Sequence, residues 1–327
     1  MKLNHIYCGN ALSILKTFPS DSIHCIITSP PYWGLRDYGI KGQLGLEPTL
    51  NLYITHLLQI TAELKRILCK DGVIFWNHND CWGGNNSRAS FGGRAGFGTP
   101  RQGVFNIPVK SKCLSLQNYR LLLRLIDDQD QGWILRNIII WHKPNHMPSS
   151  VKDRFANAYE PIFMLTKSKK YWFDLDAVRV KSNLSEVKWI QNGKFYTRPP
   201  NRILKGSKNK NQNKVKFFEQ CYCNPKGKNP GDIWVITTHG FKGAHFATFP
   251  EKLIEPMIKA GCPKDGTVLD PFCGSGTTCV AAKKLGRNYI GIDFPNRVSS
   301  MKGRLDKPAY CRMSKKRISE AIISPSQ

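Results

Sequence analysis

Thr28-Ser29-Pro30-Pro31-Tyr32 decides the fold, because it follows a short, mostly apolar run from Ile23 to Ile27. Such a run is typical of a buried strand, so the stretch leaves a sheet at a strand's carboxyl end, where open α/β sheets bind their ligands. The two prolines fix φ and push the residue before them toward an extended conformation. We therefore expect a stiff loop that presents hydrogen-bond acceptors beside a ligand site.

Three groups in this loop suit the recognition of an amine on a nucleic-acid base. The Ser29 hydroxyl and the Pro30 carbonyl can accept the two hydrogens of an exocyclic amine, and Tyr32 offers a ring face on which a base can stack. The alternative is that Pro-Pro-Tyr only ends a strand and turns the chain. The loop by itself leaves both interpretations open.

A second motif lies far along the chain, at Asp270-Pro271-Phe272-Cys273-Gly274-Ser275-Gly276-Thr277-Thr278. Its two glycines allow positive φ and a close approach of backbone to a ligand. The two threonines open a predicted helix, whose unpaired N–H groups suit a carboxylate. The turn lacks Gly-Lys-Ser/Thr, so it is not a P-loop. Asp293 ends the next predicted strand, where a carboxylate can accept hydrogen bonds from two ribose hydroxyls.

Together the two motifs resemble the catalytic and cofactor motifs of the amino-group DNA methyltransferases that use S-adenosylmethionine. Because the catalytic motif comes first, the resemblance is to the permuted β group, and it covers most of the chain. It implies a Rossmann-like α/β fold with a mostly parallel, seven-stranded sheet. It also implies an antiparallel hairpin at the sheet edge, formed by residues 161–166 and 171–173.

The resemblance also assigns the site residues. Catalysis falls to Ser29, Pro30, Pro31 and Tyr32. The cofactor site comprises Asn10, Thr28, Phe249, Asp270, Phe272, Cys273, Gly274, Ser275, Gly276, Thr277, Thr278 and Asp293, and no metal is implied. Asn10 stands where the family usually carries an acidic residue near the cofactor's adenine, and a helix cap is the alternative for it.

The reaction that this resemblance implies is direct displacement by the exocyclic nitrogen on the sulfonium methyl carbon. The Ser-Pro-Pro-Tyr spelling favours the N4 amine of cytosine, with the N6 amine of adenine as the alternative, since serine and aspartate are both acceptors. Ring-carbon methylation needs a Pro-Cys nucleophile, and no proline here precedes a cysteine. Base deaminases need His-x-Glu, which does not occur either.

The charge of the chain points to a polyanionic partner. It carries 49 basic and 23 acidic residues, a net charge of +26. Residues 178–230 alone hold 13 Lys or Arg against two Glu, with aromatic residues among them. We predict a catalytic half at 1–177, a basic target-recognition insertion at 178–240 and a cofactor half at 241–327. A charged insertion that only keeps the chain in solution is the alternative.

Double-stranded DNA is the partner that these features favour. The residues predicted to contact it are Trp33, Arg36, Arg94, Arg198 and Arg202. Arg94 lies in the glycine-rich stretch 83–103, which we interpret as a mobile loop that either folds over DNA or serves as a plain connector. A nucleic-acid-binding protein that no longer turns over and an enzyme acting on RNA are the other classes left open.

The remaining expectations concern the cellular setting. The eleven cysteines are scattered without Cys-x-x-Cys, so we expect reduced thiols. The amino terminus does not resemble a signal peptide, and no run of 18 apolar residues occurs, so we expect a cytoplasmic bacterial or phage-encoded protein with no membrane partner. The resemblance also allows a homodimer and a cognate restriction endonuclease as partners.

Overall fold

The computed structural model describes residues 1–35, 42–83, 109–128, 131–181, 226–238, 249–294 and 310–322. The chain divides into two compact units, one comprising Met1–Asp174 with Asp232–Gln327 and the other Leu175–Gly231. The second unit overlaps the basic insertion predicted at 178–240, whose role in target recognition stays a prediction. In its described part, Asp176 pairs with Arg179 at 2.7 Å and with Lys226 at 2.8 Å.

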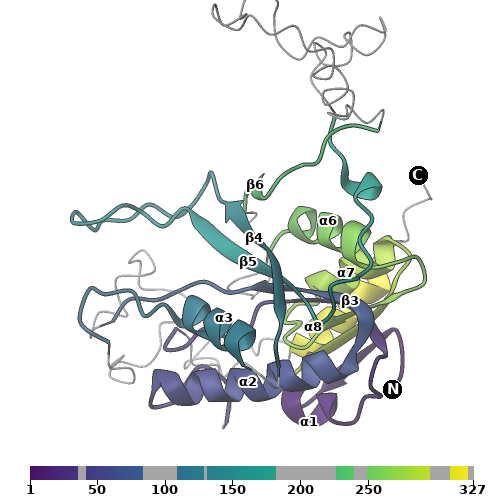
Figure 1. The fold of residues 1–327 in the computed structure, drawn as a ribbon, viewed down its shortest axis with the longest axis horizontal. Coiled ribbons are helices and arrows are strands. Elements are labelled where there is room, and N and C mark those ends of the chain that lie inside the picture. Colours follow the sequence, from purple (N-terminus) through teal and green to yellow (C-terminus); the bar gives the residue numbers. More distant parts are fainter. Residues whose placement is uncertain are drawn as a thin grey trace, which may run out of the picture. The chain divides into compact units, whose positions relative to one another are not determined.

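A sheet of eight strands in the described residues organises the first unit (Figure 1). The strand order is β1-β8-β7-β2-β3-β5-β4-β6. Every neighbouring pair is parallel except those of β5, which runs antiparallel to both β3 and β4. The strands are β1 His5–Cys8, β2 Ile23–Thr28, β3 Leu68–Asn77, β4 Ile134–His142, β5 Tyr159–Thr166, β6 Ile233–Val235, β7 Thr267–Asp270 and β8 Asn288–Asp293. The predicted α/β class with a mostly parallel sheet is confirmed, with eight strands instead of seven.

The antiparallel element differs from the predicted hairpin. Residues 171–173 form no strand, and the Trp172 N–H instead donates to the Asp71 carbonyl at 2.8 Å. β5 pairs on both sides because residues 161–166 are all buried, and a fully buried strand needs a hydrogen-bonded neighbour on each edge. The antiparallel strand therefore lies inside the sheet, with β4 and β6 beyond it.

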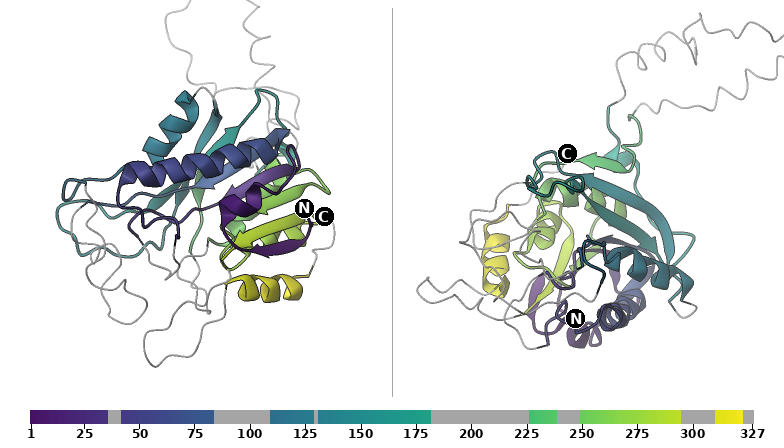
Figure 2. Two further views of the ribbon diagram at one scale, coloured as in Figure 1. Left: turned by 90° about the horizontal axis from the view of Figure 1, so that it is seen from below. Right: turned by 90° about the vertical axis from the view of Figure 1, so that its left-hand side faces the viewer.

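Helices cover both faces of this sheet (Figures 1 and 2). Helices α1, α2 and α3 share one core cluster with β2 and β3, whereas α6 and α7 pack on the opposite face in a second cluster. Helix α8 joins a smaller cluster against β1 and α7. The helices are α1 Ala11–Leu15, α2 Leu50–Ile67, α3 Gln117–Asp127, α6 Glu251–Gly261, α7 Thr277–Lys284 and α8 Tyr310–Glu320. No described helix combines the length and apolarity that crossing a bilayer requires.

The sheet order brings the two sequence motifs together. β2 and β7 are parallel neighbours, with Cys25 opposite Val268 and Ile26 opposite Leu269. Because parallel strands end at one edge, the segments that follow β2 and β7 emerge side by side. The catalytic and cofactor motifs thus meet although most of the chain separates them.

Helix α6 approaches the sheet closely at Gly261. A Cβ built on this residue would lie 2.7 Å from Phe75 Cε2, 2.7 Å from Val73 Cγ1 and 3.3 Å from Cys25 Sγ. We expect Gly261→Ala to lower the free energy of unfolding by about 1 to 3 kcal/mol, because the added methyl overpacks this core. Urea denaturation followed by circular dichroism measures the change. Lys252→Ala, on the exposed side of α6, is the control, and equal stability of both variants would contradict the packing.

Candidate active site

The loop after β2 is held from behind by a chain of buried side chains. The Tyr53 hydroxyl, from α2, donates to the Pro31 carbonyl at 2.8 Å. The same hydroxyl lies 3.2 Å from Nε2 of His78, and the Trp76 indole N–H donates to Nδ1 of that ring at 3.4 Å. Burial lowers the pKa of His78 to about 3, so the ring is neutral. Since Nδ1 accepts from Trp76, the hydrogen-bond network assigns the ring proton to Nε2, which donates to Tyr53.

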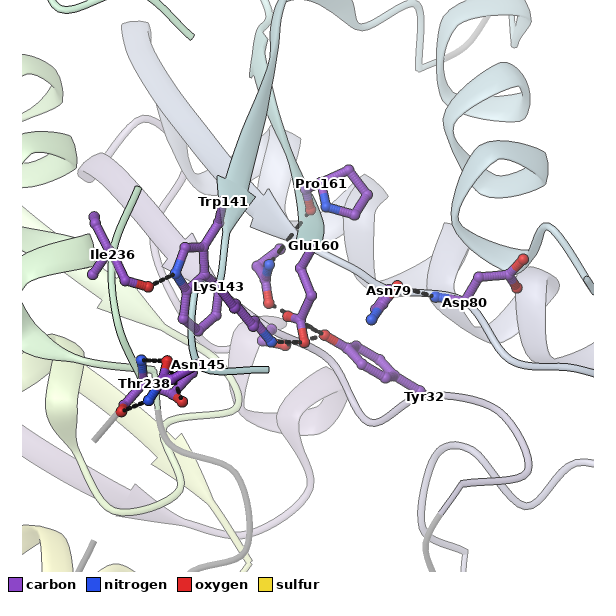
Figure 3. Close-up of polar contacts among 12 residues, drawn as sticks. Tyr32, Asn79, Asp80, Trp141, Lys143, Asn145, Glu160, Pro161, Ile236 and Thr238 are labelled. Carbon is purple, nitrogen blue, oxygen red and sulfur yellow. Dashed lines mark hydrogen bonds and ion pairs between the residues drawn. The ribbon is translucent and has the colours of Figure 1, made fainter. Parts of the chain in front are cut away.

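Tyr32 lies at the centre of the candidate catalytic site (Figure 3). Its ring stacks on His78, with centroids 5.3 Å apart and planes at 29°, so a base can stack only on its opposite face. Its hydroxyl lies 3.3 Å from Ser29 Oγ, 3.2 Å from Asn77 Oδ1 and 3.3 Å from Glu160 Oε2. Burial, reinforced by the Glu160 charge, raises the pKa of Tyr32 well above its usual value. The phenol therefore remains protonated at neutral pH.

Two charged residues adjoin Tyr32. Glu160 forms an ion pair with Lys143, and both side chains are largely buried, with 15% and 17% of their surfaces exposed. The Lys143 ammonium also lies 4.1 Å from the ring centroid of Trp141, whose indole N–H donates to the Ile236 carbonyl at 2.9 Å. The strand pair β4 and β6 thus supports the ion pair at the same sheet edge as the catalytic loop (Figure 3).

Of the five residues predicted to contact DNA, only Trp33 lies in the part of the chain that the structure describes. Trp33 is 2% exposed, its indole N–H donates to the Glu47 carbonyl at 2.8 Å, and its backbone N–H donates to Gln117 Oε1 at 2.9 Å. A ring buried in this way anchors the loop and presents no face to a nucleic acid, so the structure does not support the predicted DNA contact. Arg36, Arg94, Arg198 and Arg202, with most of the stretch 83–103, lie outside the described residues.

The first residue of the second motif, Asp270, has a buried carboxylate. It accepts hydrogen bonds from Thr28 Oγ1 at 2.8 Å, Thr278 Oγ1 at 2.7 Å and the Phe272 N–H at 3.1 Å. Thr28 and Thr278 are themselves fully buried. Burial raises the pKa of Asp270 to about 6, and the hydrogen bonds oppose that rise. Thr28, Asp270 and Thr278 were all predicted as cofactor contacts. Their buried hydrogen bonds link the two motifs.

The glycine turn has the conformation that its sequence requires. Gly274 has φ of 50° and Gly276 has φ of 80°, and a Cβ on Gly276 would lie 2.7 Å from Ser314 Cβ of α8. Asp293 Oδ2 accepts from the Gly274 N–H at 2.6 Å, and its Oδ1 accepts from the Phe294 N–H at 2.7 Å. Burial raises the pKa of Asp293 to about 6. Each carboxylate oxygen can accept a second hydrogen bond, so holding this turn is compatible with binding ribose hydroxyls.

The other predicted cofactor residues have different surroundings. Asn10 caps α1, because its Oδ1 accepts from the Ser13 N–H at 3.1 Å, which is the alternative that the sequence left open. Cys273 is buried, and its N–H donates to the Ile292 carbonyl at 3.0 Å. Phe249 and Phe272 are partly buried against the core clusters on opposite faces of the sheet. The turn, its helix and Asp293 fit a ligand that carries a carboxylate and a diol.

Arg317 is a residue of this site that the sequence did not indicate. From α8, its guanidinium donates to the Ser275 carbonyl and hydroxyl at 2.8 Å each and to Thr277 Oγ1 at 3.1 Å. It also lies 4.0 Å from Glu251. The carboxy-terminal helix thereby fixes the glycine turn from outside. Only the helical spacing of α8 could have signalled this contact, and spacing alone does not say what a helix touches.

The sequence analysis also did not identify three residues around Tyr32, namely Asn77, His78 and Glu160. Asn77 ends β3, and a polar residue directly after the apolar run 73–76 could have indicated a side chain at the ligand edge of the sheet. Glu160 lies near the start of β5, and a strand's start is at the ligand edge only if that strand runs antiparallel. Among the described residues, no group of three or more His, Cys, Asp or Glu is placed to bind a metal ion.

The raised pKa of Asp270 makes stability depend on pH. Its pKa increases from 3.8 to about 6 on folding, so the folded state binds this proton more tightly, a contribution that is present below pH 4 and lost as the pH rises through 6. Between pH 4 and 7 we expect the unfolding free energy of the wild type to fall relative to Asp270→Asn by about 2 kcal/mol. Urea denaturation at several pH values tests this. The exposed Asp265→Asn is the control, and parallel curves for wild type and Asp270→Asn would refute the assignment.

Comparison with known proteins places these motifs in a family. A model for N6/N4 methyltransferases, described as DNA methylase, matches residues 23–300. The type II methyltransferase M.Cfr9I of Citrobacter freundii is 38% identical over 295 residues, covering 88% of this chain and 83% of that protein. M.XycI of Xanthomonas campestris pv. cyanopsidis is 37% identical over 291 residues, with the same coverage.

Solved structures share the fold. The cytosine-N4-specific PvuII DNA methyltransferase matches with a TM-score of 0.59 at 19% identity, over 98% of this chain and 93% of that one. The M1.HpyAVI–SAM complex matches with a TM-score of 0.50 at 20% identity, over 96% and 98%. The predicted Rossmann-like methyltransferase fold is thus confirmed. With the family model and the relatives above 30% identity, these findings show that the chain is a DNA methyltransferase of the N6/N4 DNA methylase family.

Proposed function

We propose that this chain transfers a methyl group from S-adenosylmethionine to the exocyclic N4 amine of cytosine in double-stranded DNA. The observation that carries the proposal is the loop Ser29–Tyr32, whose Pro31 carbonyl and Tyr32 ring are fixed by Tyr53 and His78. A loop held in this way places acceptors before the target binds, and such preorganisation is the main source of rate enhancement in a direct displacement. The nitrogen–methyl bond forms as the sulfur–methyl bond breaks, S-adenosylhomocysteine leaves, and the methylated amine releases one proton to solvent.

The roles of the loop residues follow from their chemistry. Ser29 Oγ and the Pro30 carbonyl accept hydrogens from the amine, which favours a tetrahedral nitrogen with its lone pair directed away from the ring. Tyr32 supplies a stacking face, which offsets part of the stacking that a base loses when it leaves the duplex. PvuII methyltransferase is named for cytosine N4, but at 19% identity that likeness supports the fold, so the serine in the loop carries the choice of base.

The cofactor half holds the methyl donor. The turn at residues 270–278 and the amino end of α7 suit its carboxylate, and Asp293 suits its ribose hydroxyls. When bound, S-adenosylmethionine supplies an electrophilic methyl carbon to the amine. The buried hydrogen bonds from Thr28 and Thr278 to Asp270 hold this turn beside the catalytic loop.

The biological setting follows from the relatives. Because M.Cfr9I and M.XycI are named type II methyltransferases, we infer that this chain belongs to a restriction–modification system with a cognate endonuclease. The homodimer that the family resemblance allows is a further part of this proposal. Copurification of a tagged chain with the product of a neighbouring gene tests the endonuclease, and sedimentation velocity tests the dimer.

Nucleoside mass spectrometry tests the reaction and the base together. In DNA from cells that express this chain we expect N4-methylcytosine. The variant Ser29→Ala should lower its formation about 100-fold, the effect of removing one preorganised hydrogen-bonding group. Tyr32→Ala should lower it about 10- to 100-fold through lost stacking.

The nucleoside mass spectrometry distinguishes the proposed base and substrate from the alternatives. Ser319→Ala, an exposed serine on α8, is the control and should match the wild type. N6-methyladenine in place of N4-methylcytosine would keep the mechanism and replace the base. Absence of both marks from DNA, with soluble protein present, would move the proposal to an RNA substrate or to a binder that does not turn over.

The predicted target-recognition insertion has its own test. Each phosphate that a protein neutralises contributes about −0.9 to the slope of log affinity against log salt. We expect the affinity for duplex DNA to fall steeply with salt, and Arg198→Ala/Arg202→Ala to flatten the slope by about 1.8. Fluorescence anisotropy at several salt concentrations measures it, with Lys16→Ala/Lys70→Ala as the charge-matched control. A slope unchanged by the arginine substitutions would remove these residues from the DNA interface.

A further inference from the structure

We propose that Glu160 is a positioning residue that fixes the direction of the hydrogen bonds through Tyr32 to Ser29, and thereby makes Ser29 an acceptor toward the target amine. This inference rests on the proposed function of the loop, but it holds for any exocyclic amine, whether of cytosine or adenine. Two observations support the inference: the hydrogen-bond partners of the Tyr32 hydroxyl, and the ion pair between Glu160 and Lys143 (Figure 3).

The hydrogen-bonding role of Ser29 is ambiguous when its contact with Tyr32 is considered alone. A serine hydroxyl can either donate or accept, and both roles satisfy the 3.3 Å contact between Ser29 Oγ and Tyr32 Oη. Only one of them serves the reaction. If Ser29 accepted from Tyr32, its own proton would be free to point at the bound amine. A donor in that place would compete for the nitrogen lone pair that the displacement needs.

The other partners of Tyr32 remove this ambiguity. Glu160, as the acidic member of an ion pair with Lys143, is a carboxylate and can only accept. Asn77 also presents an acceptor, because its amide nitrogen donates to the Pro161 carbonyl at 3.4 Å and leaves Oδ1 toward the phenol at 3.2 Å. Tyr32 has a single proton, and donation to these acceptors uses it.

The direction of the chain then follows. With its proton committed to Glu160 and Asn77, the Tyr32 oxygen can only accept from Ser29. The Ser29 proton is used in that bond, and its remaining lone pairs are available to an amine hydrogen. A group that never touches the base thus sets the hydrogen-bonding role of one that does.

The position of Glu160 shows how the fold supplies this group. Glu160 lies at the start of the antiparallel strand β5, opposite Trp141 of β4, while Asn77 of β3 is opposite Ile162. The antiparallel direction brings the first residues of β5 to the edge where the parallel strands end. Lys143 follows β4 directly and stays against Trp141, so the ion pair is held by the two strands and not by the catalytic loop.

A double-mutant cycle tests the inference by measuring single-turnover methylation and cofactor affinity. Glu160→Gln introduces a group that can donate to Tyr32, so we expect the methylation rate to fall about tenfold with cofactor affinity unchanged. Tyr32→Phe removes the hydroxyl through which Glu160 acts. In that background Glu160→Gln should change the rate less than about twofold. Glu63→Gln, which breaks the ion pair with Arg66 on α2, is the matched control and should have no effect on the rate.

The outcomes separate three possibilities. A tenfold loss that persists in the Tyr32→Phe background would show a structural role and overturn the proposal, as would a normal rate for Glu160→Gln alone. If Glu160→Gln leaves Lys143 unpaired and the chain unstable, Glu160→Gln/Lys143→Met removes both charges, and the same comparison is made with it. Absence of methyl transfer by the wild-type chain would instead overturn the assignment of the site itself.

Discussion

The structure depends on the buried carboxylate of Asp270 and its hydrogen bonds to Thr28 and Thr278. Thr28 ends the strand before the catalytic loop, and Thr278 lies in the first turn of the cofactor helix. One buried acid therefore couples two segments that are 242 residues apart in the chain. Since a buried carboxylate without partners is unfavourable, the two segments are stable at this edge only when they are together.

The arrangement around Tyr32 follows the same physical rule with charged groups. Burying Glu160 and Lys143 costs solvation free energy, which their mutual attraction and the contact with Trp141 offset. In our proposal the function of this ion pair is to specify the direction of the hydrogen bonds that reach Ser29. The neutral His78 behind Tyr32 completes the support without adding a charge beside the loop.

Much of the fold was predictable because its signals are local. The apolar run before Thr28, the helix opened by Thr277 and Thr278 and the strand that ends at Asp293 are properties of short segments, and the structure confirms each element. The strand pairing of β5 was not predictable, because residues 161–166 form the same buried strand whether their partner is β4 or a hairpin. The conformation of the glycine turn at residues 274–276 was indicated by the glycines themselves, whereas its contact with α8 was not.

The sequence by itself determined the family and the order of its two motifs, since these depend on residue types at fixed spacing, and the chemistry that we propose for the loop rests on the same residue types. Tertiary structure alone decided which residues stand behind that loop. Tyr53 reaches it from α2, and His78 reaches it from the residue directly after β3. Arg317 reaches the cofactor turn from α8, and Glu160 faces Tyr32 only because β5 runs antiparallel. Side chains that meet across strands and helices depend on pairing and direction, and neither property is written in a local pattern.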